Sequence, residues 1–198
     1  MGDEVVKYDI IYADPPWAYR QKGRGAAENH YPVMTTDELI RLPIRDIASD
    51  KAICFMWATF PNFAEAIRLM TAWDFEYKTA AFVWVKKCKT KDSPFMGGGS
   101  YTRANAEPLL LGTSKKTHAR QQVINRSVKQ IVATGEPEAI VEPRDEHSKK
   151  PDIFRDKIVE LLGDVPRIEL FAREKAPGWH VWGNEVDSDI ILPVQIGN

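Results

Sequence analysis

Cysteine is scarce in this chain, and long apolar runs are absent from its sequence. Two cysteines in 198 residues, Cys54 and Cys88, cannot form the framework of a disulfide-stapled scaffold. The longest apolar runs fall far short of the roughly 20 residues that cross a bilayer, so no contact with a membrane is expected. Residues 1–4 also lack the charged-then-apolar pattern of a signal peptide. These shortages predict an intracellular, cytoplasmic protein.

An excess of one charge is missing as well, because 27 Lys and Arg residues face 28 Asp and Glu residues. Taken over the whole chain, this balance gives no sign of a nucleic-acid partner. The four histidines are scattered without ligand spacing, so no metal site is expected. The glycine run at residues 97–99 neither follows a strand directly nor opens a helix, which disfavours a nicotinamide or flavin enzyme. What remains is one globular domain over residues 1–198, with 43% hydrophobic residues to form its core.

Short apolar runs predict the strands of an α/β fold. They lie at residues 8–13, 51–57, 79–85, 109–111 and 167–171, with a weaker run at 128–132. Thr35 and Glu38 form a capping-box sequence for a short helix, and Pro61 opens a second, amphipathic helix. A third helix begins after Pro151 and ends at Gly163. Since strands and helices alternate, we expect a mostly parallel sheet that is covered by helices.

Ligands of such sheets bind beyond the carboxyl ends of the strands. Four segments qualify, namely residues 14–17 and the segments that follow Val85, Leu111 and Phe171. The first of them reads Asp-Pro-Pro-Trp, and its two prolines end the strand and stiffen the loop. Asp14 is therefore expected at a strand end, on a rigid loop.

The Asp-Pro-Pro-Trp sequence suits the methylation of an exocyclic amino group, such as N6 of adenine. The lone pair of that nitrogen is delocalised into the ring, so a site must hold both amino protons while the nitrogen becomes tetrahedral. Asp14 and the Pro15 carbonyl are suitable acceptors, and Asp14 can also stabilise the developing positive charge. Trp17 offers a face for a flipped base. In the alternative interpretation, Pro15 and Pro16 merely end a strand and Trp17 belongs to the core.

Further motifs follow in a fixed order, at residues 31–35, 79–86, 103–107, 146–152, 169–173 and 177–185. Together with residues 14–17, they make the chain from Tyr8 to Glu185 resemble the adenine-N6 methyltransferases of the Asp-Pro-Pro-Trp type. This family is related to the catalytic subunit of the eukaryotic messenger-RNA adenosine methyltransferase. The likeness is closest to its short bacterial and phage members.

The resemblance implies a Rossmann-like, S-adenosylmethionine-dependent methyltransferase sheet with a rearranged motif order, in which the catalytic loop comes first and the cofactor strand last. It implies that Asp14 contacts both base and cofactor, and that Tyr31 lies beside the base pocket. It also places a set of residues at the cofactor: Ser148, Lys150, Phe171, Arg173, Asn184 and Glu185. The pair Glu174 and Lys175 departs from the eukaryotic relatives, so only Arg173 is carried over at that point.

A local excess of positive charge is hidden in the near-neutral sum. Between Trp84 and Gln130 ten basic residues stand against two acidic ones, so this region carries +8 and the rest of the chain −9. We expect two substrate-recognition loops here, at about residues 86–107 and 114–130, on the active-site side of the sheet. The residues expected to contact the substrate are Lys86, Lys87, Arg103, Asn105 and Glu107, of which the last three resemble an Arg-x-Asn-x-Glu motif of the family. In the alternative interpretation, these lysine-rich loops are simply solvated.

Three functional hypotheses follow from the sequence. The leading one is transfer of a methyl group to N6 of adenine in DNA, with RNA as its nearest variant, without a covalent enzyme intermediate. A catalytically inactive nucleic-acid-binding subunit is disfavoured, because residues 14–17 are intact. A cytosine-N4 or small-molecule methyltransferase is the third hypothesis, since fold does not fix function. The sequence is compatible with a homodimer or with a partner subunit.

Overall fold

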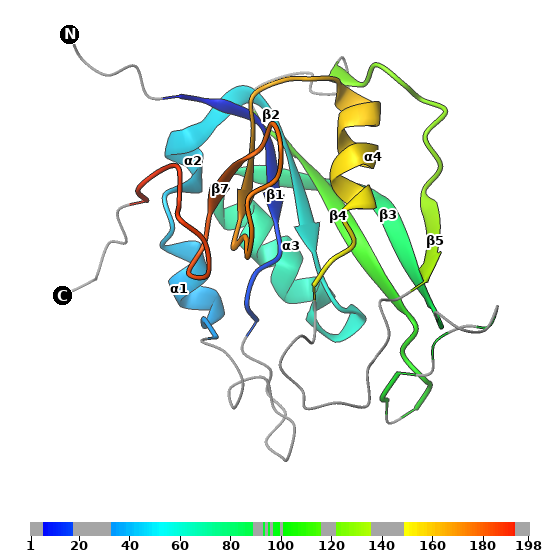
Figure 1. Cartoon of the computed structure of the whole chain (residues 1–198). Coiled ribbons are helices and arrows are strands. Elements are labelled where there is room, and N and C mark those ends of the chain that lie inside the picture. Colours follow the sequence, from blue (N-terminus) through cyan, green and yellow to red (C-terminus); the bar gives the residue numbers. More distant parts are fainter. Residues whose placement is uncertain are drawn as a thin grey trace, which may run out of the picture.

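The structure, a computed structural model, describes residues 6–17, 33–88, 93, 95, 97–99, 101–115, 122–135 and 149–192. Within these residues a seven-stranded sheet has the order β5-β3-β4-β2-β1-β6-β7 (Figure 1). Its strands are β1 (Tyr8–Ala13), β2 (Ala48–Trp57), β3 (Phe75–Lys87), β4 (Ala106–Ser114), β5 (Ile131–Gly135), β6 (Arg167–Leu170) and β7 (His180–Trp182). β4 runs antiparallel to its neighbours β2 and β3, and the other neighbouring strands are parallel. The expected α/β class, with a mostly parallel, Rossmann-like sheet, is confirmed.

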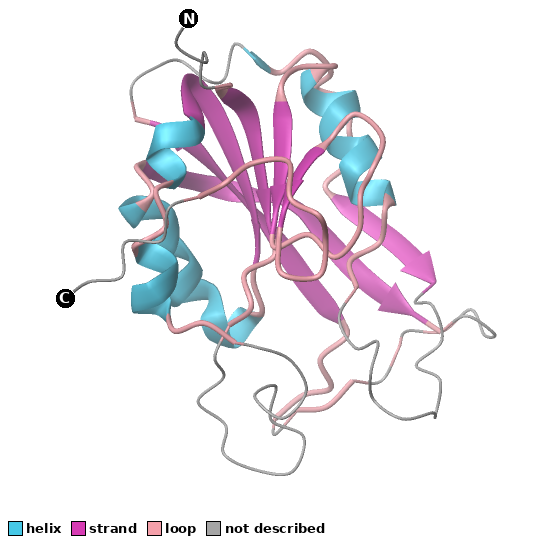
Figure 2. Cartoon of the chain, turned by 60° about the vertical axis from the view of Figure 1, so that its left-hand side comes forward, coloured by secondary structure: helices cyan, strands magenta, loops and turns pink. Residues whose placement is uncertain are grey.

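Helices cover both faces of this sheet, as Figure 2 shows. One face carries α1 (Thr36–Ile40), α2 (Ile44–Ile47) and α3 (Phe63–Ala72), and α3 is entered through the 3-10 turn η2 (Phe60–Asn62). The other face carries α4 (Ile153–Leu162). No helix in the described part of the chain is long and apolar enough to span a membrane.

The helix ends follow the local signals in the sequence. Thr35 and Glu38 form the expected capping box of α1: the Glu38 amide donates to Oγ1 of Thr35 at 3.3 Å, and the Thr35 amide donates to Oε2 of Glu38 at 2.7 Å. Gly163 ends α4 with a φ of 86°, which favours glycine, and its amide donates to the Val159 carbonyl at 2.7 Å. The sequence pattern does not predict α2, because four residues are too few for helical periodicity.

Alternate residues of the central strands enter two separate cores. The core under α1, α2 and α3 takes, among others, Ile11, Ala13, Cys54, Met56 and Leu110. The core under α4 takes Tyr12, Trp57, Trp84, Leu109 and Phe154. Because successive side chains of a strand point to opposite faces, Asp14 follows Tyr12 onto the α4 side of the sheet.

The direction of β4 corrects one expectation. Because β4 is antiparallel, its first residues lie at the edge where β1, β2 and β3 end, and the chain leaves it at the opposite edge. There Nζ of Lys115 lies 3.3 Å from the carboxylate of Asp74, just before β3. Further along, the amide of Ile124 donates to the Leu161 carbonyl at the carboxyl end of α4. The expectation that residues 114–130 begin at the active-site edge is therefore wrong. The sequence could not show this, because an apolar run does not reveal the direction of its strand.

Other strands also differ from what the sequence predicts: β2 and β4 are longer than their apolar runs, and β5 begins three residues later than the run at 128–132. β3 begins at Phe75, and besides this residue only Phe82 and Trp84 are buried along it, whereas the sequence predicts a buried strand from residue 79. β6 ends one residue early, because Phe171 has a φ of 62° and turns the chain. β7 has only three residues, too few to be predicted from periodicity.

Candidate active site

A cavity of about 230 Å³ opens where the parallel strands end and β4 begins. Its walls come from the segments that follow β1, β2, β6 and β7, from the start of β4 and from the segment before α4: Asp14, Pro15, Pro16, Trp17, Trp57, Ala58, Thr59, Glu107, Lys150, Phe171, Ala172, Arg173, Asn184 and Glu185. This is the position at which open α/β sheets bind ligands.

Asp14 lies on a rigid loop directly after β1. Two consecutive prolines fix the backbone angle φ, and their carbonyls accept backbone hydrogen bonds. The amide of Trp17 donates to the Pro15 carbonyl at 2.8 Å, and the amide of Met34 donates to the Pro16 carbonyl at 2.9 Å. The loop therefore presents Asp14 to the cavity in a defined position. A carbonyl oxygen has two lone pairs, so Pro15 retains one for a ligand.

Opposite charges alternate along one wall of the cavity. Nζ of Lys150 lies 3.0 Å from Oδ2 of Asp14 and 3.5 Å from Oε2 of Glu107. The other oxygen of Glu107, Oε1, lies 2.8 Å from Nζ of Lys86 on β3. These four side chains are between 10% and 28% exposed, so water screens their interactions less than it screens surface pairs.

The two carboxyl groups of this cluster titrate differently. Burial raises the pKa of Asp14, although the ammonium of Lys150 opposes the shift through its charge and its hydrogen bond. Burial by itself also raises the pKa of Glu107, but the charges of Lys150 and Lys86 outweigh it, and the pKa of Glu107 is lowered. Glu107 is thus the more firmly ionised carboxylate, and the charge of Asp14 is less fully compensated.

The opposite wall forms where β6 and β7 end. Phe171 lines the cavity with a positive φ, which is uncommon for a bulky residue and is found at functional sites. Gly183 follows β7 so closely beside β6 that a Cβ atom there would lie 2.2 Å from the carbonyl oxygen of Ala172. In the residues that follow on the two segments, Nε of Arg173 lies 3.7 Å from Oε1 of Glu185.

Comparison with known proteins connects this cavity to one family. The protein family MT-A70 matches residues 8–185, which run from β1 to the cavity residues after β7. Over 209 residues the chain is 34% identical to the type II methyltransferase M.MunI of Mycoplasma sp, covering 96% of this chain and 82% of M.MunI. The chain belongs to the MT-A70 family.

Two other relatives of this MT-A70 protein are longer. The human N(6)-adenine-specific methyltransferase METTL4 is 28% identical over 90% of this chain and 37% of METTL4. The N6-methyladenosine RNA methyltransferase MTA1 of Pyricularia oryzae is 28% identical over 90% of this chain and 47% of MTA1. The chain therefore spans less than half the length of METTL4 and MTA1. All three relatives are named methyltransferases, and this MT-A70 protein is a methyltransferase as well.

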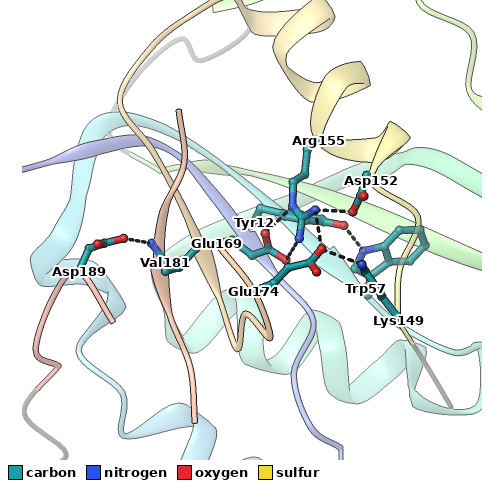
Figure 3. Close-up of polar contacts among 9 residues, drawn as sticks. All are labelled: Tyr12, Trp57, Lys149, Asp152, Arg155, Glu169, Glu174, Val181 and Asp189. Atoms are coloured by element: carbon teal, nitrogen blue, oxygen red, sulfur yellow. Dashed lines mark hydrogen bonds and ion pairs between the residues drawn. The ribbon is translucent and has the colours of Figure 1, made fainter. Parts of the chain in front are cut away.

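Buried polar contacts fix α4 of this MT-A70 protein, and with it Lys150, which precedes the helix. Arg155 of α4 contacts Glu169 of β6 twice, with 2.6 Å between Nε and Oε2 and 3.2 Å between Nη2 and Oε1. Figure 3 shows this pair within a group of ion pairs. Glu169 is the cross-strand neighbour of Tyr12 on β1. The pair thus attaches α4 to β6, the neighbour of the strand that leads into Asp14.

Trp57, at the end of β2, joins the cavity to the same network. Its Nε1–H donates to the hydroxyl of Tyr12 at 2.7 Å (Figure 3), and its ring lies edge-on to Phe154 of α4 at 4.7 Å between centroids. Nζ of Lys150 lies 5.5 Å from the centroid of the Trp57 ring. The sequence pattern does not single out the cavity residues Trp57, Ala58 and Thr59. A signal was present, because Trp57 ends a strand that is parallel to β1, and Ala58 and Thr59 follow it just as Asp14 follows β1.

The structure brings together most of the predicted site residues of this MT-A70 protein. Those that line the cavity are Asp14, Pro15, Pro16, Trp17, Glu107, Lys150, Phe171, Arg173, Asn184 and Glu185. Lys86 joins them through Glu107, whereas Lys87, Arg103 and Asn105 are not among the lining residues. Tyr31 and Ser148 lie outside the described residues.

The burial of Trp17 corrects a second expectation. Its side chain is only 7% exposed and belongs to the core under α1, α2 and α3. Its indole N–H points to the carbonyl of Trp57 at 3.4 Å. The open stacking face expected from the sequence is therefore wrong, and the alternative of a core tryptophan describes its burial better. Trp17 nevertheless contributes to the wall of the cavity.

Proposed function

We propose that this MT-A70 protein transfers a methyl group from S-adenosylmethionine to N6 of adenine in nucleic acid, with DNA favoured over RNA. One observation carries the proposal: Asp14 and Pro15 both line the cavity, on a loop held by backbone hydrogen bonds. The names of METTL4 and MTA1 support adenine N6 as the target atom.

In the proposed reaction the two acceptors hold the two protons of the amino group. Asp14 accepts one and the Pro15 carbonyl accepts the other, so the nitrogen lone pair is turned out of conjugation and towards the methyl group. Positive charge then develops on the nitrogen, and the partly buried Asp14 carboxylate stabilises it. The resulting cation is acidic and loses its proton to Asp14 or to water, so no stronger base is required.

The cavity residues fit S-adenosylmethionine, which carries a sulfonium, an ammonium and a carboxylate. The walls hold both signs of charge, with three carboxylates and two cations from Asp14, Glu107, Glu185, Lys150 and Arg173. Phe171 offers an aromatic face for the adenine part, and Asn184 and Glu185 offer polar groups for the ribose hydroxyls. When bound, the cofactor would supply the electrophilic methyl group.

The proposed roles of the cavity residues also imply an order of the catalytic and cofactor motifs along the chain. Asp14 follows β1 near the amino end, whereas the residues proposed to hold the cofactor follow β6 and β7 near the carboxyl end. We therefore propose the rearranged order, with the catalytic motif first and the cofactor motif last.

The connection between β3 and β4, residues 88–105, is together with Lys87 the proposed contact with the polynucleotide. It begins and ends beside the cavity, because Trp84 and Glu107 face each other across the two strands. Arg103 and Tyr101 are exposed on it, so a cation and an aromatic ring are available to phosphates and bases. Lys87 and Asn105 belong to the same proposed surface.

DNA is favoured because the likeness to M.MunI extends over most of both chains. RNA is the second candidate, since MTA1 is named an RNA methyltransferase but shares less than half of its length with this chain.

The proposal is tested with labelled S-adenosylmethionine and unmethylated DNA and RNA of matched sequence, followed by digestion to nucleosides. We expect the label in N6-methyladenine of the DNA. Label in RNA alone would make RNA rather than DNA the substrate. Label on cytosine would support the alternative of a cytosine-N4 methyltransferase. Label in neither polymer, with cofactor binding shown by calorimetry, would overturn the proposed function.

A further inference from the structure

Lys86 makes contacts that differ from those of a surface lysine that binds phosphate. Its ammonium lies 2.8 Å from Oε1 of Glu107 and 4.7 Å from the centroid of the Trp84 ring, and its side chain is 19% exposed. Trp84 is buried and faces Glu107 directly across β3 and β4. The ammonium of Lys86 therefore lies over the ring of Trp84 and forms an ion pair with Glu107, the residue opposite Trp84 on β4.

Lys150 repeats this arrangement from the opposite side. It lies over the ring of Trp57 and approaches the second oxygen of Glu107 at 3.5 Å. The rings of Trp57 and Trp84 are themselves edge-on, with 6.2 Å between centroids. Glu107 is thus held between two ammonium groups, each of which stands on an indole ring. Lys150 continues from Glu107 to Asp14, at 3.0 Å.

We propose that Lys86 is a positioning residue for methyl transfer: by binding one oxygen of Glu107, it leaves Lys150 shared between Glu107 and Asp14. The inference rests on the proposed function for the reaction, and on the contacts above for the arrangement. Without Lys86, Lys150 is the one of these two lysines that still binds Glu107. Its ammonium is then drawn towards Glu107 and away from the carboxylate of Asp14.

The charged groups that face this cluster predict how its titration responds. They are Lys86 from β3, Glu107 from β4, Lys150 before α4, Asp14 after β1 and Arg173 after β6, together with Glu169 of β6 and Tyr12 of β1, which both interact with Asp14. Lys150 and, more weakly, Arg173 lower the pKa of Asp14, whereas Glu107 raises it. A Lys150 that moves away from Asp14 therefore lets the pKa of Asp14 rise.

The test compares three charge-removing variants of the same strand, all studied in the full chain. For Lys86→Met we expect kcat to fall roughly 10- to 100-fold and the acid limb of its pH profile to move to higher pH. The dissociation constant of an adenine-containing oligonucleotide and its salt dependence should not change. Lys86→Arg should recover both kcat and the acid limb, because it keeps the positive charge.

The two matched variants separate positioning from phosphate binding. Lys87→Met should weaken oligonucleotide binding and flatten its salt dependence without moving the acid limb. Lys78→Met removes a lysine that pairs with Glu76 near the start of β3, and it should alter neither property. If Lys86→Met behaves like Lys87→Met, Lys86 is a phosphate contact and the proposal is overturned.

A crystal structure of Lys86→Met provides a readout that does not depend on activity. We expect Nζ of Lys150 closer to Glu107 and more than 3.0 Å from Asp14. Unchanged positions of Glu107 and Lys150 would overturn the proposal. If the shift is seen but the wild-type protein does not methylate adenine, it is the proposed function that fails, and the positioning contact stands.

Discussion

The two faces of the sheet use neighbouring residues of the same strands for different purposes. Under α1, α2 and α3, the strands β1, β2 and β4 supply apolar side chains, such as Ile11, Cys54 and Leu110. Under α4, the same strands supply apolar side chains, such as Phe55 and Leu109, and also polar or charged groups that are hydrogen-bonded or ion-paired, such as Tyr12, Trp57 and Glu107. The alternation of a β-strand thus places an apolar core and a charge cluster one residue apart.

Two carboxylates of the α4 face, Asp14 and Glu169, do not favour folding in their ionised form, whereas the lowered pKa of Glu107 means that folding favours its charge. Burial raises the pKa of both Asp14 and Glu169, so their ionised forms are less favourable in the folded chain than in the unfolded chain. Replacing such groups by apolar ones is often neutral or stabilising in other proteins. The buried charge of Asp14 is therefore best explained by chemistry rather than by stability.

Truncation on the apolar face should produce the largest loss of stability. Leu110 is fully buried in that core, so Leu110→Ala should lower the free energy of unfolding by about 2–5 kcal/mol, through lost burial and a residual cavity. Urea unfolding measures the loss, and kcat per folded molecule should remain that of the wild type. A collapse of kcat without loss of stability would show that the two faces cannot be separated.

A change on the α4 face should act on the pH dependence of the reaction. Lys150→Met removes the charge that opposes the raised pKa of Asp14, so this pKa should rise further. Because Asp14 must be ionised to accept the amino proton, the acid limb of the kcat profile should move to higher pH, with a loss of roughly tenfold or more at neutral pH. Lys157→Met, which removes an exposed partner of Glu160 on α4, serves as control and should not move the limb. An unmoved limb in Lys150→Met would contradict the assigned contact.

The smallest effect is expected at the rim of the cavity. The side chain of Glu185 is 60% exposed, so Glu185→Gln should weaken the binding of S-adenosylmethionine only several-fold, as measured by calorimetry. Asp187→Asn removes an even more exposed carboxylate nearby and should leave this affinity unchanged. Equal affinities for both variants and the wild type would remove Glu185 from the cofactor site.

Much of the fold could be predicted, because its signals are local. The apolar run of β1, the capping box of Thr35 and Glu38, and the glycine that ends α4 depend on neighbouring residues only. The position of Asp14 at a cavity also follows from a general property of parallel sheets. The resemblance to a family implied that Lys150 and Arg173 lie at the cofactor and Glu107 at the substrate, and all three line the cavity with Asp14.

What could not be predicted depends on contacts between distant segments. The antiparallel direction of β4 is set by its pairing with β2 and β3, and it places Ser114 and Lys115 at the edge opposite the one expected for the start of a recognition loop. The burial of Trp17 depends on Trp57, 40 positions along the chain. The pairing of Lys86 with Glu107 likewise needs the register of β3 on β4. In the sequence alone, Lys86 is one of several similar lysines.

Asp14→Asn is the most direct test of the division between the two faces, because it keeps the size of the side chain and removes its charge. We expect kcat for the methylation of adenine to fall by about 10³-fold. The free energy of unfolding at pH 7 should equal or exceed that of the wild type, since a raised pKa means that folding disfavours the ionised form. Asp156→Asn, at an exposed position of α4, should change neither quantity. Wild-type kcat in Asp14→Asn, or a loss of kcat that merely follows a loss of folded protein, would contradict the account.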